Sequence, residues 1–154
     1  MEVDDNPTAK ESRRTILVVD DNRQLIEFLT DALEGLGDFV VVTATDGAQG
    51  LERYYDVRPD CVVVDARMPG IDGYQLVRAL RGDPDSTSTS LIIFSALAQE
   101  REQIAGLLAG ADLYLVKPVD PLELIQAIQG VLQQSDAKRR QHQQALLDDP
   151  SLNW

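Results

Sequence analysis

Five polar side chains that could perform chemistry follow short apolar runs of this chain: three carboxylates, a hydroxyl and an ammonium group. They are Asp20, Asp21, Asp65, Ser95 and Lys117. Two carboxylates about 4 Å apart repel by about 4 kcal/mol at the effective dielectric of a protein surface, so these acids need a counter-charge if they meet. A divalent cation supplies it, and Mg²⁺ suits best because it needs few carboxylates and keeps waters that a phosphoryl oxygen can replace.

The hydroxyl and the ammonium group narrow the chemistry to phosphoryl transfer. Ser95 can donate a hydrogen bond and Lys117 can place a positive charge, which is what the equatorial oxygens of a phosphoryl group require. The set predicts in-line attack by a carboxylate on a phosphoryl donor, which gives an acyl phosphate. Any one of these residues alone is commonly a helix cap or solvated surface, so the prediction rests on their joint placement.

The elements that must position these residues alternate along the sequence. Apolar, β-branched or aromatic runs predict strands at Thr15–Val19, Phe39–Thr43, Cys61–Val64, Leu91–Phe94 and Leu113–Val116. Helical periodicity predicts helices at Arg23–Leu36, Gly47–Tyr55, Gly73–Arg81, Gln99–Ala109 and Pro121–Gln134. The first helix is expected to bury one apolar stripe, formed by Leu25, Phe28, Leu29, Ala32, Leu33 and Leu36.

Strict alternation of strands and helices predicts an α/β fold with a doubly wound, five-stranded parallel sheet. We expect the strand order 2-1-3-4-5 of the flavodoxin-like (βα)5 arrangement, because the elements are too few for an eight-stranded barrel. In such sheets ligands bind beyond the carboxyl ends of the strands, where the strand order reverses. The five polar residues all fall at those ends.

Four segments resemble the receiver domains of bacterial two-component response regulators, over about Thr15–Gln134. The segments are Ile16–Asn22, Asp65–Gly73, Phe94–Ala96 and Gly110–Pro118. They occur in the family's order and at its spacing, so the resemblance is specific. It implies a protein that accepts a phosphoryl group from a histidine kinase or a histidine phosphotransfer protein and signals by a conformational switch.

The resemblance also implies a role for each matched residue. Asp65 would be the phosphoacceptor, and it would hold Mg²⁺ together with Asp20, Asp21 and the backbone carbonyl of Arg67. Ser95 and Lys117 would contact the phosphoryl oxygens.

Two further features follow from the same resemblance. Tyr114 would be the switch aromatic that turns inward when Ser95 is drawn toward the phosphate, and the Lys117–Pro118 peptide bond would be cis. Such a protein is not an enzyme in the ordinary sense, because it assists only its own phosphorylation and dephosphorylation.

The chain is expected to have three parts. Residues 1–14 would be a disordered N-terminal arm, 15–134 the receiver domain, and 135–154 a short tail too small for an output domain. The signal would then be read by a downstream protein target or by a second copy. The tail carries several apolar residues that could support a homodimer, although packing on the same domain or disorder explains them equally well: Ala145, Leu146, Leu147, Leu152 and Trp154.

Composition limits the partners and the compartment. The formal net charge of -12 disfavours direct contact with nucleic acid, which needs a basic surface. The apolar runs are too short to span a membrane, and Met1–Arg14 lacks the apolar core of a secretory signal. Cys61, the single cysteine, lies in an apolar run and is expected to be a buried core thiol. The cytoplasm is therefore the expected location.

Three other classes of protein fit these residues less well than a receiver domain does. A Mg²⁺-dependent aspartate-nucleophile phosphohydrolase of the dehalogenase type is also α/β, but it wants its nucleophile after the first strand in an Asp-x-Asp pattern and a cap segment. Asp20–Arg23 fits that pattern poorly, and no cap insertion is visible. An unphosphorylated interaction module would be expected to lack one of the acids, and none is missing. A dinucleotide-binding domain is disfavoured because no Gly-x-Gly-x-x-Gly follows the first strand.

Overall fold

A single parallel sheet forms the centre of the protein, whose computed structural model describes residues 13–152. Its strands are ordered β2-β1-β3-β4-β5, as predicted. They are β1 (Thr15–Val19), β2 (Val40–Ala44), β3 (Cys61–Val64), β4 (Ser90–Ser95) and β5 (Leu113–Val116). The predicted bounds are correct for three strands, whereas β2 is shifted by one residue and β4 is one residue longer at each end, so Ser95 closes β4 instead of following it.

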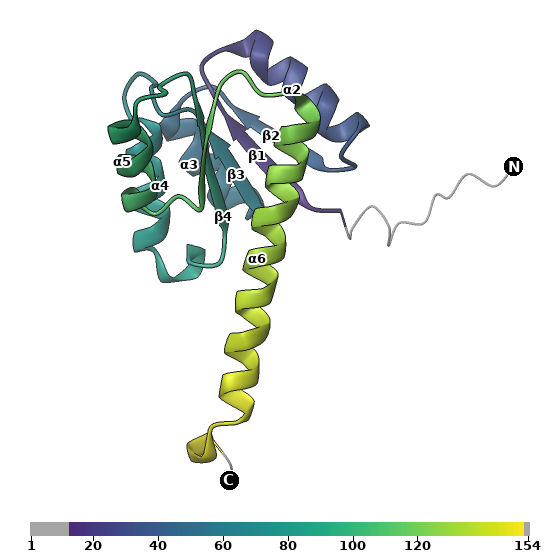
Figure 1. Cartoon of the computed structure of the whole chain (residues 1–154), viewed down its shortest axis with the longest axis vertical. Coiled ribbons are helices and arrows are strands. Elements are labelled where there is room, and N and C mark those ends of the chain that lie inside the picture. The colour runs from purple at the N-terminus through teal and green to yellow at the C-terminus, as the bar shows by residue number, and fades with distance from the viewer. Residues whose placement is uncertain (1–12, 153–154) are drawn as a thin grey trace, which may run out of the picture.

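Helices cover both faces of the sheet (Figure 1). On one face lie α2 (Arg23–Gly35) and α6 (Pro121–Leu147). On the other lie α3 (Gly47–Val57), α4 (Gly73–Gly82) and α5 (Glu100–Ala109), and a short 3-10 helix, η1 (Pro84–Ser86), follows α4.

Successive strand residues point to opposite faces, so the sheet supplies two hydrophobic cores. In β3, Val62 and Val64 pack under α3, α4 and α5, whereas Cys61 and Val63 pack under α2 and α6. Cys61 is a buried free thiol, as expected, and burial raises its pKa well above the ordinary value. This thiol is therefore a core residue and not a reactive group.

The first helix, α2, buries a narrower stripe than its sequence predicts. Ile26, Leu29 and Leu33 are buried, whereas Phe28 is 55% and Leu36 67% exposed. The buried positions are three and four residues apart and lie along one line of the helix, while Phe28 points to a neighbouring side. The predicted stripe was therefore wrong at Phe28 and Leu36.

The last helix, α6, is much longer than predicted. It continues without a break to Leu147, so the prediction that it ends at Gln134 was wrong. Apolar periodicity does stop near Gln134, but the following residues contain neither Gly nor Pro and include many strong helix formers. The hydroxyl groups of Ser135 and Ser90 hydrogen-bond at 2.6 Å, and beyond this contact the helix projects away from the sheet (Figure 1).

Arg14, near the start of the described residues, contacts α6 as well. The Arg14 guanidinium pairs with the carboxylates of Asp60 and Asp136, and the Arg14 carbonyl accepts a hydrogen bond from the Val40 amide. Arg14 therefore belongs to the folded body, although it was expected in the arm. Arg13, the residue before it, is also described and pairs with Asp38 at 3.2 Å. Residues 1–12 of that predicted arm lie outside the described residues, as does Trp154. Among the described residues, no helix is long and apolar enough to cross a membrane.

Candidate functional site

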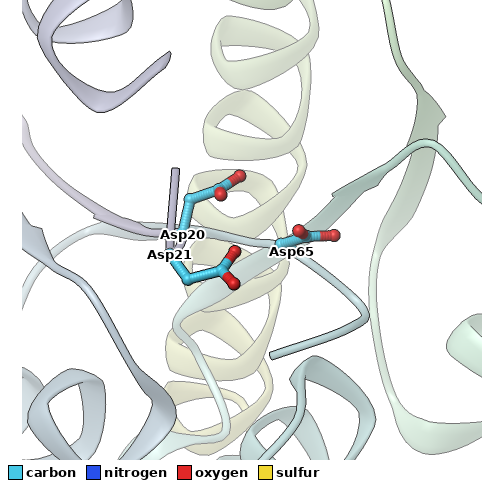
Figure 2. A group of neighbouring side chains, drawn as sticks. All are labelled: Asp20, Asp21 and Asp65. Atoms are coloured by element: carbon cyan, nitrogen blue, oxygen red, sulfur yellow. The ribbon is translucent and has the colours of Figure 1, made fainter. Parts of the chain in front are cut away.

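Three carboxylates meet at the carboxyl edge of the sheet. Asp20 and Asp21 follow β1 and Asp65 follows β3, and these strands are neighbours with Val19 paired to Val64. Each of the three side chains offers an oxygen, and these oxygens all lie within 4.8 Å of one another (Figure 2). Asp20 is buried, Asp65 is partly buried and Asp21 is exposed, so the cluster is open to solvent on one side.

Lys117 brings a positive charge to these acids from the end of β5. Its ammonium group lies 2.7 Å from Asp20 Oδ2 and 3.6 Å from Asp65 Oδ2. The side chain passes the ring of Phe94, whose centroid is 5.4 Å from the ammonium nitrogen, and the Lys117 amide donates to the Ser95 carbonyl at 2.8 Å. The Lys117–Pro118 bond is cis, as the family resemblance implied. The expected approach of Lys117 to the acids is therefore confirmed, with Asp20 as its nearer partner.

The surroundings of Asp65 make its charged form costly. Burial raises the pKa of Asp65, Lys117 lowers it and Asp20 raises it again, and the net result is a pKa above the ordinary value. The backbone amide of Arg67 donates a weak hydrogen bond of 3.4 Å to Asp65 Oδ1. An additional cation beside Asp65 would therefore stabilise its ionised form.

The donor set suits Mg²⁺. Asp20, Asp21 and Asp65 supply hard carboxylate oxygens from two neighbouring strand ends, and the exposed position of Asp21 leaves room for the waters that Mg²⁺ retains. Because Lys117 already pairs with Asp20 in the described structure, a cation bound here would share this carboxylate with the ammonium group.

Ser95 and Tyr114 are linked through Leu97. The Leu97 amide donates to Ser95 Oγ at 3.2 Å, and the Tyr114 hydroxyl donates to the Leu97 carbonyl at 2.8 Å. Both side chains are buried, so Tyr114 points inward. The sequence pointed to both residues, but it gave no sign that one peptide segment connects them.

Glycines let two helices approach the site closely. A Cβ on Gly73, the first residue of α4, would lie 2.3 Å from the Asp65 carbonyl oxygen. A Cβ on Gly106 in α5 would lie 2.7 Å from Tyr114 Cδ2. Only glycine therefore allows α4 to begin against the Asp65 segment and α5 to pack on the Tyr114 ring.

Sequence reasoning missed a second set of contacts near Asp65. Glu102, in the first turn of α5, pairs with the guanidinium of Arg67 at 3.6 Å and accepts a hydrogen bond from the Tyr74 hydroxyl at 2.7 Å. Arg67 was expected to be a backbone ligand of the metal, and its pairing with Glu102 was not predicted. No local pattern marks a glutamate on one helix as the partner of a distant loop arginine.

The strand order is that of a flavodoxin-like α/β protein. Its acidic cluster, which could hold a metal ion, lies at the topological switch point, where the strand order reverses. Residues 16–129 match the family model of the response regulator receiver domain. The chain belongs to this family, which is part of two-component signalling.

Curated relatives agree with this assignment. The chain is 37% identical over 126 residues to the probable transcriptional regulator ycf27 of Guillardia theta, a match that covers 82% of this chain and 48% of that protein. It is 36% identical over 124 residues to the DNA-binding response regulator MtrA of Mycobacterium tuberculosis, covering 80% and 53%. The chain thus spans about half the length of the curated relatives it matches.

Solved structures confirm the fold. A putative response regulator from Chloroflexus aurantiacus superposes with a TM-score of 0.74 at 35% identity, covering 79% of this chain and 98% of the other. A CheY-like receiver domain protein from Methanospirillum hungatei gives a TM-score of 0.76 at 25% identity, covering 82% and 99%.

Proposed function

We propose that this receiver domain accepts a phosphoryl group from a histidine kinase or a histidine phosphotransfer protein onto Asp65. The observation that carries the proposal is the convergence of three carboxylates and the Lys117 ammonium group on one sheet edge, with Ser95 ending the intervening strand. Family membership supports it.

The proposed transfer needs no other co-reactant than the phosphohistidine. One oxygen of the Asp65 carboxylate attacks the phosphorus, a new O–P bond forms and the P–N bond to the imidazole breaks. The electron pair of that bond returns to the imidazole nitrogen, and because the other ring nitrogen of the phosphohistidine carries a proton, the leaving group is neutral histidine. Lys117, at 3.6 Å from Asp65 Oδ2, is placed to balance the charge of the acyl phosphate.

We include Mg²⁺ in the proposal, held by Asp20, Asp21, Asp65 and the backbone carbonyl of Arg67. When bound, it would offset negative charge on the phosphoryl oxygens. The side chains would divide the remaining work: Lys117 supplies a second positive charge, and Ser95 supplies a hydroxyl donor from the end of β4.

The signal would leave the site through the segment that joins Ser95 to Tyr114. If the Ser95 hydroxyl turns toward a phosphoryl oxygen, its hydrogen bond from the Leu97 amide weakens. The Leu97 carbonyl holds the Tyr114 hydroxyl, so a shift of this segment alters the packing of Tyr114 against α5. A downstream protein or a second copy would read the changed surface.

The proposal places this receiver in the cytoplasm and gives it no direct contact with DNA. Two relatives are named as a transcriptional regulator and a DNA-binding response regulator, and both are about twice as long as their match to this chain. With a net charge of -12, the present chain offers little attraction for phosphate backbones.

Phosphorylation with a small donor tests the proposal. We expect acetyl phosphate to add one phosphoryl group to the wild-type protein in the presence of Mg²⁺ and none with a chelator, as read by intact-mass spectrometry. Asp65→Asn should remove the adduct, and Asp21→Ala should raise the Mg²⁺ concentration required. A full adduct on the Asp65→Asn protein would contradict the assignment.

The same samples distinguish the receiver from a phosphohydrolase. A receiver forms one acyl phosphate per chain and loses it slowly, whereas a phosphohydrolase releases many equivalents of phosphate from a small phosphoester. Sustained multiple turnover that is abolished by Asp20→Asn would favour the phosphohydrolase.

A further inference from the structure

A second chain of contacts leads from the Asp65 segment to α5 without passing through Ser95. Arg67, in the loop after β3, has its guanidinium 3.6 Å from Glu102 Oε1. Tyr74, in the first turn of α4, donates its hydroxyl to Glu102 Oε2 at 2.7 Å. One carboxylate in the first turn of α5 therefore ties together the acceptor loop, α4 and α5.

The two partners of Glu102 differ in how firmly they are held. The Arg67 side chain is 66% exposed, whereas the Glu102 side chain is 17% exposed. An ion pair with an exposed arginine is weak and is easily exchanged for another anion. The bond from Tyr74 is more secure, because burial and the Glu102 hydrogen bond raise the pKa of Tyr74 and keep its phenol a donor. The N-terminal end of α5 also favours a carboxylate at this position.

Phosphorylation of Asp65 would place a competing anion close to Arg67. The Arg67 amide already donates to Asp65 Oδ1 at 3.4 Å, so the two residues share one turn of the loop. A phosphoryl group carries roughly one and a half to two negative charges near neutral pH. Guanidinium groups bind phosphate oxygens with paired hydrogen bonds, so the new anion would compete with Glu102 for Arg67.

This inference rests on the proposed phosphoacceptor function. We propose that Glu102 is a positioning residue, which holds Arg67 on α5 in the unmodified protein and releases it to the phosphoryl group on Asp65. We call the ion pair between Arg67 and Glu102 the tether. When this ion pair breaks, α5 is no longer connected to the acceptor loop, but Glu102 keeps its hydrogen bond from Tyr74. The tether gives α5 a second connection to the phosphorylation site, parallel to the path through Ser95, Leu97 and Tyr114.

Glu102→Gln tests the tether directly. Glutamine keeps the size of the side chain and an oxygen for Tyr74, but it removes the charge that holds Arg67. We expect the apparent affinity for beryllofluoride in the presence of Mg²⁺, measured by fluorine NMR, to rise by roughly two- to fivefold, the range of an exposed ion pair. Glu100→Gln is the matched control, because Glu100 is an exposed acid in the same turn of α5. It should leave the affinity unchanged.

A double-mutant cycle separates positioning from a general structural effect. Arg67→Ala should weaken beryllofluoride binding, and Glu102→Gln should add nothing in the Arg67→Ala background, because no guanidinium remains to be released. Circular dichroism checks that each variant keeps the wild-type fold.

Each remaining outcome would count against a specific claim. An equal gain from Glu100→Gln, a gain that persists without Arg67, or no gain from Glu102→Gln would overturn the tether while leaving the proposed function intact. A wild-type protein that binds no beryllofluoride with Mg²⁺ would overturn the proposed function and the tether together.

Discussion

At the scale of single residues, the charge of the site comes from three carboxylates and one ammonium group. Lys117 lies closer to Asp20 than to Asp65, and the net effect of the surroundings is to raise the pKa of Asp65. The folded protein therefore binds a proton on Asp65 more tightly than the unfolded chain does. The contribution of Asp65 to stability falls as pH rises from the ordinary aspartate range through the raised pKa, because the unfolded chain loses that proton first.

Replacing Asp65 by asparagine should therefore stabilise the metal-free protein. At neutral pH and with a chelator present, we expect Asp65→Asn to raise the free energy of unfolding by about 1 kcal/mol, because the attraction of Lys117 offsets most of the roughly 4 kcal/mol repulsion between two carboxylates at a protein-surface dielectric. The gain should shrink as pH falls from the raised pKa of Asp65 to the ordinary aspartate range, and Mg²⁺ should stabilise the wild type more than the variant.

Urea unfolding across this pH range measures the difference. Asp31→Asn is a suitable control, because Asp31 is an exposed aspartate of α2 that is not part of the acidic cluster. A variant less stable than the wild type at neutral pH would show that Asp65 is net stabilising when charged.

At the scale of elements, a glycine, Gly106, allows α5 to pack closely on β5. Gly106 faces the Tyr114 ring, and an added Cβ would lie 2.7 Å from Tyr114 Cδ2 and 2.9 Å from Ile93 Cδ1. Both contacts are too short for carbon atoms, so the Tyr114 and Ile93 side chains or α5 itself would have to shift. The position of α5 and the inward orientation of Tyr114 therefore depend on the same small residue.

Alanine at Gly106 should destabilise the protein, although alanine is the better helix former. We expect Gly106→Ala to lower the free energy of unfolding by about 1 to 3 kcal/mol, the usual effect of overpacking. Gly130→Ala in α6 is the matched control, since nothing lies within 4 Å of a Cβ there. It should raise the free energy of unfolding by up to about 1 kcal/mol. Equal effects of the two substitutions in urea titrations would show that α5 has more freedom than the packing indicates.

At the scale of the whole molecule, two groups of exposed apolar side chains lie on α5 and at the far end of α6. Ile104, Leu107 and Leu108 are exposed on α5, and Leu146 and Leu147 are exposed at the far end of α6. The projecting part of α6 is otherwise mostly polar, and a short helix without a partner is only marginally stable in water. A second copy of the chain is the partner we expect there.

We expect beryllofluoride and Mg²⁺ to shift the protein from monomer toward dimer in light scattering. A chain ending at Arg140 keeps the bonds of Ser135 and Asp136 to the body but lacks the apolar end of α6, and it should stay monomeric. Leu147→Glu should behave like this shortened chain, whereas Leu36→Glu, at an exposed leucine after α2, should behave like the wild type. Monomers in every sample would exclude the dimer and leave a different protein as the reader of the signal.

The strand order and the convergence of the acids follow from local patterns in the amino-acid sequence. Alternating apolar runs and helical stretches fix a parallel sheet, and a parallel sheet brings all carboxyl strand ends to one edge. The positions of Asp20, Asp21, Asp65, Ser95 and Lys117 relative to those runs were therefore enough to predict that they converge. Local patterns carry this information, because strand and helix periods are properties of short segments.

The pairing of the charged side chains and the end of the last helix could not be predicted in this way, because they depend on how distant segments pack. Lys117 and Asp20 are 97 positions apart in the sequence, and nothing local indicates that Lys117 lies nearer to Asp20 than to Asp65. The pairing of Glu102 with Arg67 likewise depends on how α5 packs beside α4. The extension of α6 is supported by helix propensity and by contacts from Ser90 and Arg14, whereas the apolar pattern that marked the other helices stops earlier. These features depend on distances between segments that fold together only in the complete domain.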